Sequence, residues 1–138
     1  MAEPKTRATG ASVGAFLAGI EDAQVRRDCR AVMDMMSKAT KAKPRMWGGS
    51  IVGFGTHPIK YASGREADWP IAAFSPRKQN IVLYLSASFP ARDALLKTFG
   101  NHSCGKGCVY IKRISDVHVP TLRALVNASV KHTLRNAR

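Results

Sequence analysis

The apolar residues in the first third of the chain recur at helical spacing. Ser12, a residue type that caps helix N-termini, precedes the apolar positions of a short helix that reaches about Ile20. A longer helix is expected from about Asp22, with one apolar stripe and charged side chains on the rest of its surface. The stripe consists of Val25, Cys29, Val32, Met33 and Met36. Pro44 is expected to end this helix.

From Arg45 the pattern changes to glycine alternating with β-branched and aromatic residues, which is typical of strands with close backbone neighbours. MWGGSIVGFGTHPIKY, residues 46–61, predicts a first strand. WPIAAFSP, residues 69–76, and NIVLYLS, residues 80–86, predict two more. The polar segment that links these two predicts a hairpin turn.

Two helices and a fourth strand complete the pattern. PARDALLKTFG, residues 90–100, predicts a helix that Gly100 caps, and CVYIKRI, residues 108–114, predicts the strand. The last helix tolerates Pro120 in its first turn. Its inward residues are Leu122, Leu125, Val126 and Val130. This order predicts an α+β fold, in which an antiparallel β-sheet carries α-helices packed on one face.

The length of the chain predicts one domain. It has 138 residues, of which 45% are hydrophobic, so it can bury a core. Residues 1–11 lack apolar periodicity and are expected to form a flexible tail, residues 12–131 the domain, and residues 132–138 a basic end that frays. Glu3 interrupts the basic start and no long apolar run follows, which favours a polar tail over a signal peptide and predicts a cytoplasmic protein without a membrane span.

The chain is strongly basic. It contains 22 lysines and arginines against 9 acidic residues, a formal net charge of +13. Such a field attracts nucleic acids, anionic membranes and small anions alike. The charges are spread along the whole chain rather than gathered in one tract, which weakens the case for nucleic acid without removing it.

The cysteines and histidines indicate neither a metal site nor a catalytic group. Cys104 and Cys108 lie four residues apart, but zinc needs four ligands and only His102 is close to them in sequence. Inert thiols in a reducing compartment are the expectation. The four histidines, His57, His102, His118 and His132, are scattered, and His57 is expected to be exposed in a turn. Cys104 near His102 is the only nucleophile pair that the sequence offers, and no Ser–His–Asp grouping can be assembled. The sequence therefore favours a non-enzymatic function without a cofactor.

A block of aromatic and basic residues in the middle of the chain is the candidate binding site. Three segments are expected to converge on one face: the segment around Trp47, residues 61–78 and residues 102–112. Lys106 lies between two glycines whose backbone N–H groups suit a small anion, and tyrosine and tryptophan provide flat walls. The candidate ligand-binding residues are Trp47, Tyr61, Arg65, Trp69, Lys78, Lys106, Tyr110 and Lys112. Solvated surface charges and core tryptophans are the alternative interpretation of the same residues.

An ordered series of motifs resembles the YdhG-like domain family, a domain of unknown function grouped with frataxin-like folds. The motifs are WG at Trp47, FG at Phe54, Tyr61, DWP at Asp68, FSPRKQN at Phe74 and GKGCVYIK at Gly105. The likeness runs from about Ser12 to Val130. It implies a compact α+β domain with an antiparallel sheet and, for some relatives, an iron-chaperone role in iron–sulfur cluster supply.

The iron role requires carboxylate oxygens, because hard cations prefer them. The comparable helix of this chain carries Glu21, Asp22, Asp28 and Asp34, interleaved with Arg26, Arg27 and Arg30. The sequence therefore departs from what an iron chaperone needs. The leading hypothesis is a small binding domain whose basic, aromatic-lined face accepts a small anionic ligand or an acidic protein partner. A frataxin-like iron chaperone and a nucleic-acid-binding protein are the alternatives, and a homodimer is compatible with the sequence.

Overall fold

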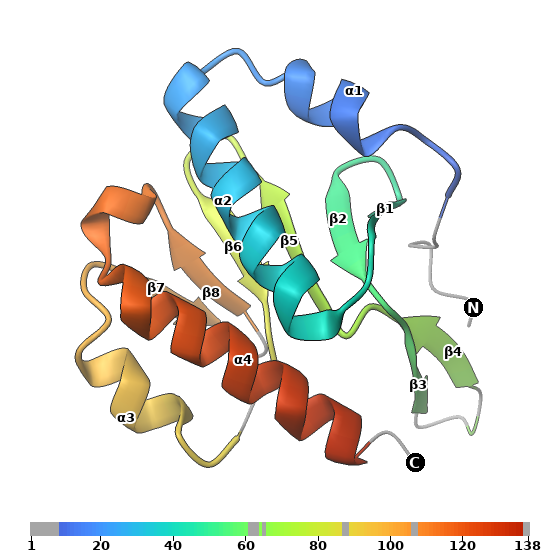
Figure 1. Ribbon diagram of the computed structural model, residues 1–138, viewed down its shortest axis with the longest axis vertical. Helices are drawn as coiled ribbons and strands as arrows, with labels where there is room; N and C mark the ends of the chain where they lie inside the picture. Colours follow the sequence, from blue (N-terminus) through green and yellow to red (C-terminus); the bar gives the residue numbers. More distant parts are fainter. Residues whose placement is uncertain (1–8, 61–63, 65, 87–88, 106–107, 137–138) are drawn as a thin grey trace.

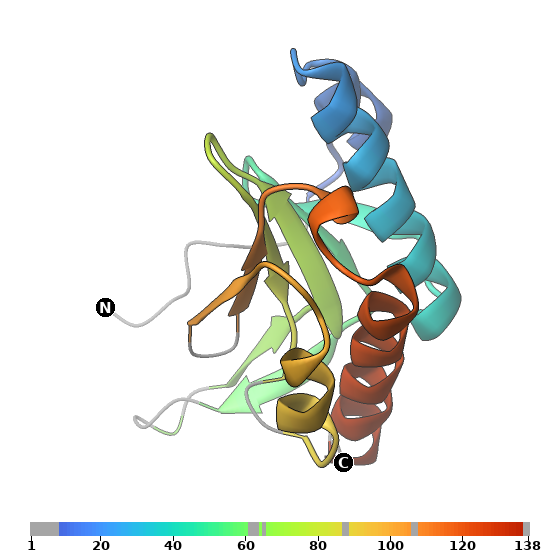
Figure 2. The same ribbon diagram turned by 90° about the vertical axis from the view of Figure 1, so that its left-hand side faces the viewer.

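One six-stranded antiparallel sheet lies at the centre of the protein, and α-helices pack on one of its faces (Figure 1). The structure is a computed structural model that describes residues 9–60, 64, 66–86, 89–105 and 108–136. The strand order is β1-β2-β5-β6-β8-β7, and β3 and β4 form a separate two-stranded sheet. Seen edge-on, the main sheet has the helices on one side (Figure 2). The predicted α+β fold, with helices packed on one face of an antiparallel sheet, is confirmed.

The elements have the following bounds. The helices are α1 (Val13–Ala18), α2 (Ala23–Thr40), α3 (Arg92–Lys97) and α4 (Val119–Asn136), with a 3-10 turn η1 (Ile114–Asp116). The strands are β1 (Pro44–Trp47), β2 (Ile51–Phe54), β3 (His57–Lys60), β4 (Glu66–Trp69), β5 (Ala72–Pro76), β6 (Ile81–Tyr84), β7 (Ser103–Gly105) and β8 (Cys108–Ile111).

The first two helices begin where their caps predict. The Ser12 side chain accepts a hydrogen bond from the backbone N–H of Ala15 at 3.0 Å, and Asp22 accepts one from that of Gln24 at 2.8 Å. Each such cap contributes about 1 kcal/mol to helix stability. The end of α2 differs from the prediction. Lys41 adopts a left-handed conformation and ends the helix after Thr40, while Pro44 already belongs to β1.

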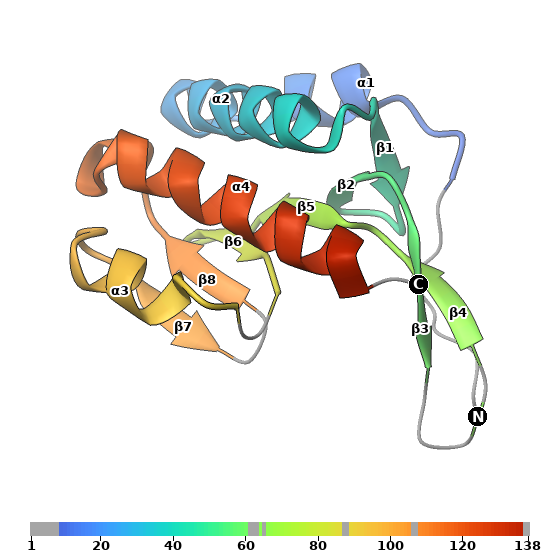
Figure 3. The ribbon, with the colours of Figure 1, turned by 60° about the horizontal axis from the view of Figure 1, so that its bottom comes forward.

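The prediction of a single strand over residues 46–61 is wrong, because glycine conformations divide this segment into three strands. Gly48, with φ of 63°, turns the chain between β1 and β2, which then pair antiparallel. Gly55, with φ of 65°, leads the chain out of the main sheet into β3. Glycine adopts such positive φ without steric cost. The β3–β4 hairpin projects beside the main sheet (Figure 3), and the predicted strand 69–76 is likewise divided between β4 and β5.

The hairpin between β5 and β6 is confirmed, with Pro76 opposite Ile81. A β7–β8 hairpin was not predicted: the segment 103–105 forms a strand that pairs with β8. Gly100 also has a different role, because α3 ends at Lys97 and Thr98 is its C-cap. With φ of 114°, Gly100 bridges to Val117, and a Cβ there would lie 2.6 Å from the Asp116 carbonyl oxygen.

The chain ends are more closely tied to the domain than the sequence indicates. The backbone N–H of Thr9 donates to the carbonyl oxygen of Met46 at 2.8 Å, so the last residues of the expected tail contact β1. At the other end α4 continues to Asn136 instead of fraying from residue 132. In the described part of the chain, no helix combines the length and the apolar character that crossing a membrane would need.

The core lies between the sheet and the helices. The predicted inward residues of α4 are all buried. Large apolar side chains of the strands meet them and the α2 stripe: Met46, Val52, Phe54, Phe74, Leu83, Val109 and Ile111. Asp28 is a buried charged residue in this layer, and its carboxylate accepts hydrogen bonds from the Gln24 side chain at 2.8 Å and the Ile114 backbone at 3.1 Å. These bonds connect α2 to the segment that leads into α4.

Candidate functional site on the open face of the sheet

The second face of the main sheet has no helix over it in the described part of the chain (Figure 2). Successive side chains of a strand point to opposite faces, so the residues between the core positions point to this side. We call this surface the open face. Its strand residues are Arg45, Trp47, Ile51, Gly53, Ala73, Ser75, Val82, Tyr84, Ser103, Gly105, Cys108 and Tyr110. It thus combines aromatic rings and two branched aliphatic side chains with several very small residues.

Two tryptophans cover the β1–β2 end of the open face. Trp47 is buried at 3% exposure, and the half-buried Trp69 of β4 tilts over it with ring centroids 6.2 Å apart. The Trp47 indole lies directly on the backbone of Gly53, where a Cβ would come within 2.6 Å of Trp47 Cδ1 and 2.8 Å of Pro70 Cβ. Glycine is therefore required at position 53 by the close approach of a ring. Trp47 serves as core, while Trp69 retains exposed surface.

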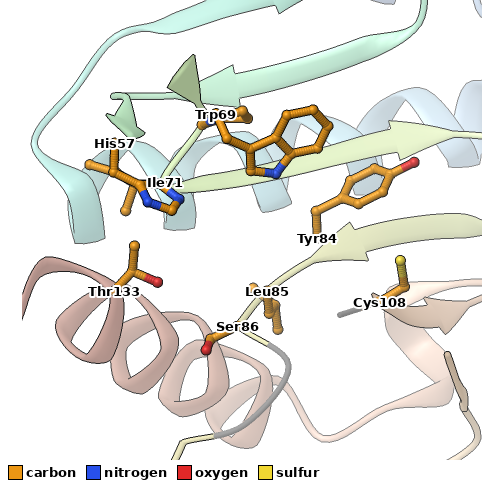
Figure 4. Close-up of a pocket in the computed structure, with 9 residues that line it drawn as sticks. His57, Trp69, Ile71, Tyr84, Leu85, Ser86, Cys108 and Thr133 are labelled. Atoms are coloured by element: carbon orange, nitrogen blue, oxygen red, sulfur yellow. The ribbon is translucent and has the colours of Figure 1, made fainter. Parts of the chain in front are cut away.

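A cavity of about 430 Å³ opens beside Trp69 and Tyr84 (Figure 4). Five elements and the link after β4 contribute to its wall. The lining residues are His57, Trp69, Pro70, Ile71, Tyr84, Leu85, Ser86, Cys108 and Thr133. His57 and Thr133 lie on one side of the cavity and Tyr84 and Cys108 on the other (Figure 4). The cavity therefore joins ring surfaces to an imidazole, hydroxyls and a thiol.

His57 is half-buried at the start of β3, so the prediction that it is exposed in a turn is wrong. Burial lowers the pKa of its imidazole below the ordinary value of 6.5, and a hydrogen bond with the Pro58 backbone opposes that shift. Burial lowers a histidine pKa because it disfavours the charged form. At neutral pH the cavity therefore contains a neutral imidazole, which can both donate and accept hydrogen bonds.

Arg77 is the cation that the structure positions most firmly on the open face. Its Nε donates to Ser75 Oγ at 3.0 Å, and its Nη2 donates to the Tyr84 hydroxyl at 2.9 Å. Ser75 Oγ in turn donates to the Ser50 carbonyl oxygen at 2.6 Å. A guanidinium has five N–H donors, so two bonds leave three for a ligand. Because Arg77 is exposed, an anion can reach them.

Tyr110 extends this surface to β8. Tyr84 is opposite Cys108 and Val82 is opposite Tyr110, so the two tyrosines are diagonal neighbours on adjacent strands. The Tyr110 hydroxyl lies over Gly105, 2.9 Å from where a Cβ would stand. A hydrogen bond with the Cys108 side chain is the main cause that raises the pKa of Tyr110 above its ordinary value. The ring therefore remains a neutral phenol at physiological pH.

A second cavity, of about 200 Å³, lies at the far end of β8. Residues with amide, imidazole and hydroxyl groups line it together with Tyr110 and one lysine. The lining residues are Gln79, Asn80, Asn101, His102, Ser103, Tyr110, Ile111 and Lys112. His102 Nδ1 lies 2.8 Å from the Gly100 carbonyl oxygen, and its ring contacts Phe99 with centroids 5.2 Å apart. These contacts hold the imidazole at the cavity rim.

The structure brings half of the predicted site residues to the open face. These are Trp47, Trp69, Tyr110 and Lys112. Lys78 is exposed in the β5–β6 turn and lines a separate hollow beside α1, together with Arg77. Tyr61, Arg65 and Lys106 lie outside the described residues.

Sequence reasoning missed His57, Tyr84 and Cys108 as lining residues. One signal was available. Ser75 and Arg77 lie two residues apart, so period-2 counting places these two on one face. Tyr84 joins them only through the register of the hairpin, in which it is opposite Ala73. No signal in the sequence brings His57 next to Thr133.

The described residues offer no metal centre. Cys104 is opposite Val109 and Cys108 opposite Gly105, so the two thiols point to opposite faces of the β7–β8 hairpin. In the part of the chain that the structure covers, no three His, Cys, Asp or Glu side chains gather in a way that could hold a metal ion. Burial, aided by the Asp28 charge, raises the pKa of the Cys29 thiol to about 12. Cys29 is thus an inert buried thiol.

The carboxylates of α2 are dispersed over separate roles. Asp22 caps the helix. Asp28 is buried and accepts a hydrogen bond from the Ile114 backbone, and Asp34 pairs with Lys38 at 3.1 Å on the surface. The iron-chaperone alternative therefore gains no support from them.

Comparison of the chain with protein-family models, with curated proteins and with solved structures found no match. The resemblance to the YdhG-like domain family stays a prediction. The function proposed below is therefore argued from the geometry of the open face.

Proposed function

We propose that the protein is a non-enzymatic binding domain that holds a small anionic ligand on the open face. Arg77 binds the anionic group, and the exposed surfaces of Trp69 and Tyr84 contact the apolar or ring part beside the cavity. The observation that carries this proposal is the fixed position of the Arg77 guanidinium, which is bonded to Ser75 and Tyr84.

The fixed position has a physical consequence for affinity. An arginine that is already ordered loses less side-chain entropy when it binds, so more of the interaction energy appears as affinity. Its remaining N–H groups can form the bidentate, charge-assisted bonds that carboxylates and phosphates accept. The net charge of +13 draws anions toward the protein from a distance.

The arrangement of the cavity favours binding over catalysis. A thiol nucleophile needs a base within hydrogen-bond reach. Cys108 and His57 lie on opposite sides of the cavity (Figure 4), so they do not form such a pair. Rings, hydroxyls and a neutral imidazole are the usual lining of a ligand pocket.

Intrinsic fluorescence tests the proposal directly, because both tryptophans of the chain lie at the open face. Organic phosphates and carboxylates are titrated while tryptophan emission is followed, and calorimetry confirms the hits. We expect saturable binding that Arg77→Ala weakens by about tenfold or more, since a hydrogen bond to a charged group contributes about 1.5–3 kcal/mol.

The matched control is Arg30→Ala, which removes the same charge from an exposed position on α2, behind the sheet. It is expected to leave the affinity within about twofold of wild type, because surface charge alone acts weakly at a distance in salt. Flat titrations with every anion, or equal losses in the two variants, would refute the proposal.

A further inference from the structure

The two cavities of the open face belong to one continuous surface. The first is bounded by Tyr84 and Cys108, and the second contains Tyr110. Tyr84 and Tyr110 are diagonal neighbours on β6 and β8, a relation in which Cα atoms lie about 7–8 Å apart. Arg77 donates a hydrogen bond to the Tyr84 hydroxyl. A chain-like ligand can therefore cross from one cavity to the other along the sheet.

The two cavities offer different chemistry. The first presents the ring surfaces of Trp69 and Tyr84 with a neutral imidazole. The second is lined by Tyr110 and by three residues with side-chain amides, Gln79, Asn80 and Asn101. Amides carry both donors and acceptors, so they match the mixed hydrogen-bonding edges of nucleobases. Lys112 adds a cation at the far end.

We infer that the open face binds single-stranded nucleic acid. Bases stack on Trp69, Tyr84 and Tyr110, and phosphates bind Arg77 and Lys112. This inference rests on the proposed function and names the class of its anionic ligand. An open antiparallel sheet with helices on its other face is a known platform for stacking two or three unpaired bases on aromatic side chains. The charge of +13 is complementary to the strand.

Other anionic partners use less of this surface. A duplex keeps its bases stacked inside and cannot bring them against half-buried rings. An acidic peptide pairs with Arg77 and Lys112 but leaves the amide-lined cavity without a matching edge. A mononucleotide fills one cavity only. A single strand alone engages the rings, the amides and both cations together.

Fluorescence anisotropy of short labelled strands tests the inference. Mixed-sequence single-stranded DNA and RNA are compared with the matching duplex and with an acidic peptide of equal charge. We expect the single strand to bind at least about tenfold more tightly than the duplex or the peptide, since stacking contributes about 1–3 kcal/mol per base. Its affinity is expected to fall as salt rises.

Two substitutions at one position provide the sharpest comparison. Tyr110→Ala removes the ring and is expected to weaken strand binding by about tenfold, whereas Tyr110→Phe keeps the ring and retains the affinity. Thermal melting of both variants shows that each is folded. If the duplex or the acidic peptide binds as tightly as the strand, or if Tyr110→Ala binds like wild type, the inference is overturned.

The failure of this inference is distinguishable from the failure of the proposed function. If no strand binds while organic phosphates or carboxylates still titrate against Arg77, the ligand is a small anion and only the inference fails. If neither a strand nor a small anion binds, the proposed function fails as well.

Discussion

The two faces of the main sheet come from the same strands but have opposite compositions. The covered face carries Val52, Phe74, Leu83 and Val109, which are all buried beneath α2 and α4. One residue away along the same strands, the open face mixes glycine, alanine and serine with Ile51, Val82, tyrosine and tryptophan. The covered face is apolar, whereas the open face is partly exposed, and a hydrogen bond from Arg77 holds the Tyr84 hydroxyl there.

This difference shows which side chains of the sheet the fold requires and which it does not. A two-layer domain requires one apolar face against its helices, and the other face of an antiparallel sheet is ordinarily polar and solvated. Half-buried tyrosines, a tryptophan pair and a bonded arginine exceed that requirement. We therefore expect the covered face to account for stability, and the proposed function places binding on the open face. Three experiments test this division, in addition to those on Arg77 and Tyr110.

The largest expected effect is on the covered face. Phe74 is fully buried and stacks on Phe54 with ring centroids 6.4 Å apart. Phe74→Ala is expected to lower the free energy of unfolding by about 3–5 kcal/mol, because it leaves a cavity in the core. Urea denaturation measures the loss. Tyr84→Phe, on the open face, is the counterpart: a stability loss as large as that of Phe74→Ala would contradict the division between the faces.

An intermediate effect is expected where the open face is most tightly packed. Gly53→Ala forces a Cβ against Trp47 and Pro70. Overpacking of this kind costs about 1–3 kcal/mol, and the displaced indole should also shift the tryptophan emission. Gly49→Ala is the matched control, because a Cβ there meets nothing within 4 Å. Equal stability of the two variants would show that Trp47 is not fixed against the sheet.

The smallest effect concerns the pH dependence of stability. Because burial lowers the pKa of His57, the unfolded chain binds a proton more readily than the folded one. The His57 contribution is therefore fully present above the ordinary pKa of 6.5 and is lost as the pH falls through the lowered value. The free energy of unfolding, measured by denaturation between about pH 5 and pH 8, should decrease less steeply with falling pH in His57→Gln than in wild type. An identical pH dependence in the two proteins would show that the His57 imidazole is as solvated in the folded state as in the unfolded state.

Local patterns predicted most of the architecture. The caps at Ser12 and Asp22, the stripes of the two long helices and the β5–β6 hairpin follow from contacts within a few residues of one another. The division of residues 46–61 into three strands did not follow, because glycine fits both a strand and a turn, and only neighbouring strands select its φ. Burial of Trp47 by Trp69 likewise depends on β3 and β4 leaving the main sheet.

The sequence by itself determined the fold class, the helical stripes and the presence of aromatic and basic residues in the middle of the chain, because these depend on composition and on periods of two and three to four residues. Only the tertiary structure decided which of those residues form a site. Lys78 and Arg77 both line the hollow beside α1, but Arg77 is also bonded to Tyr84 on the open face. His57 and Thr133 line the same cavity only because β3 and the end of α4 are brought together. Such proximity is a property of long-range packing, which residue spacing does not encode.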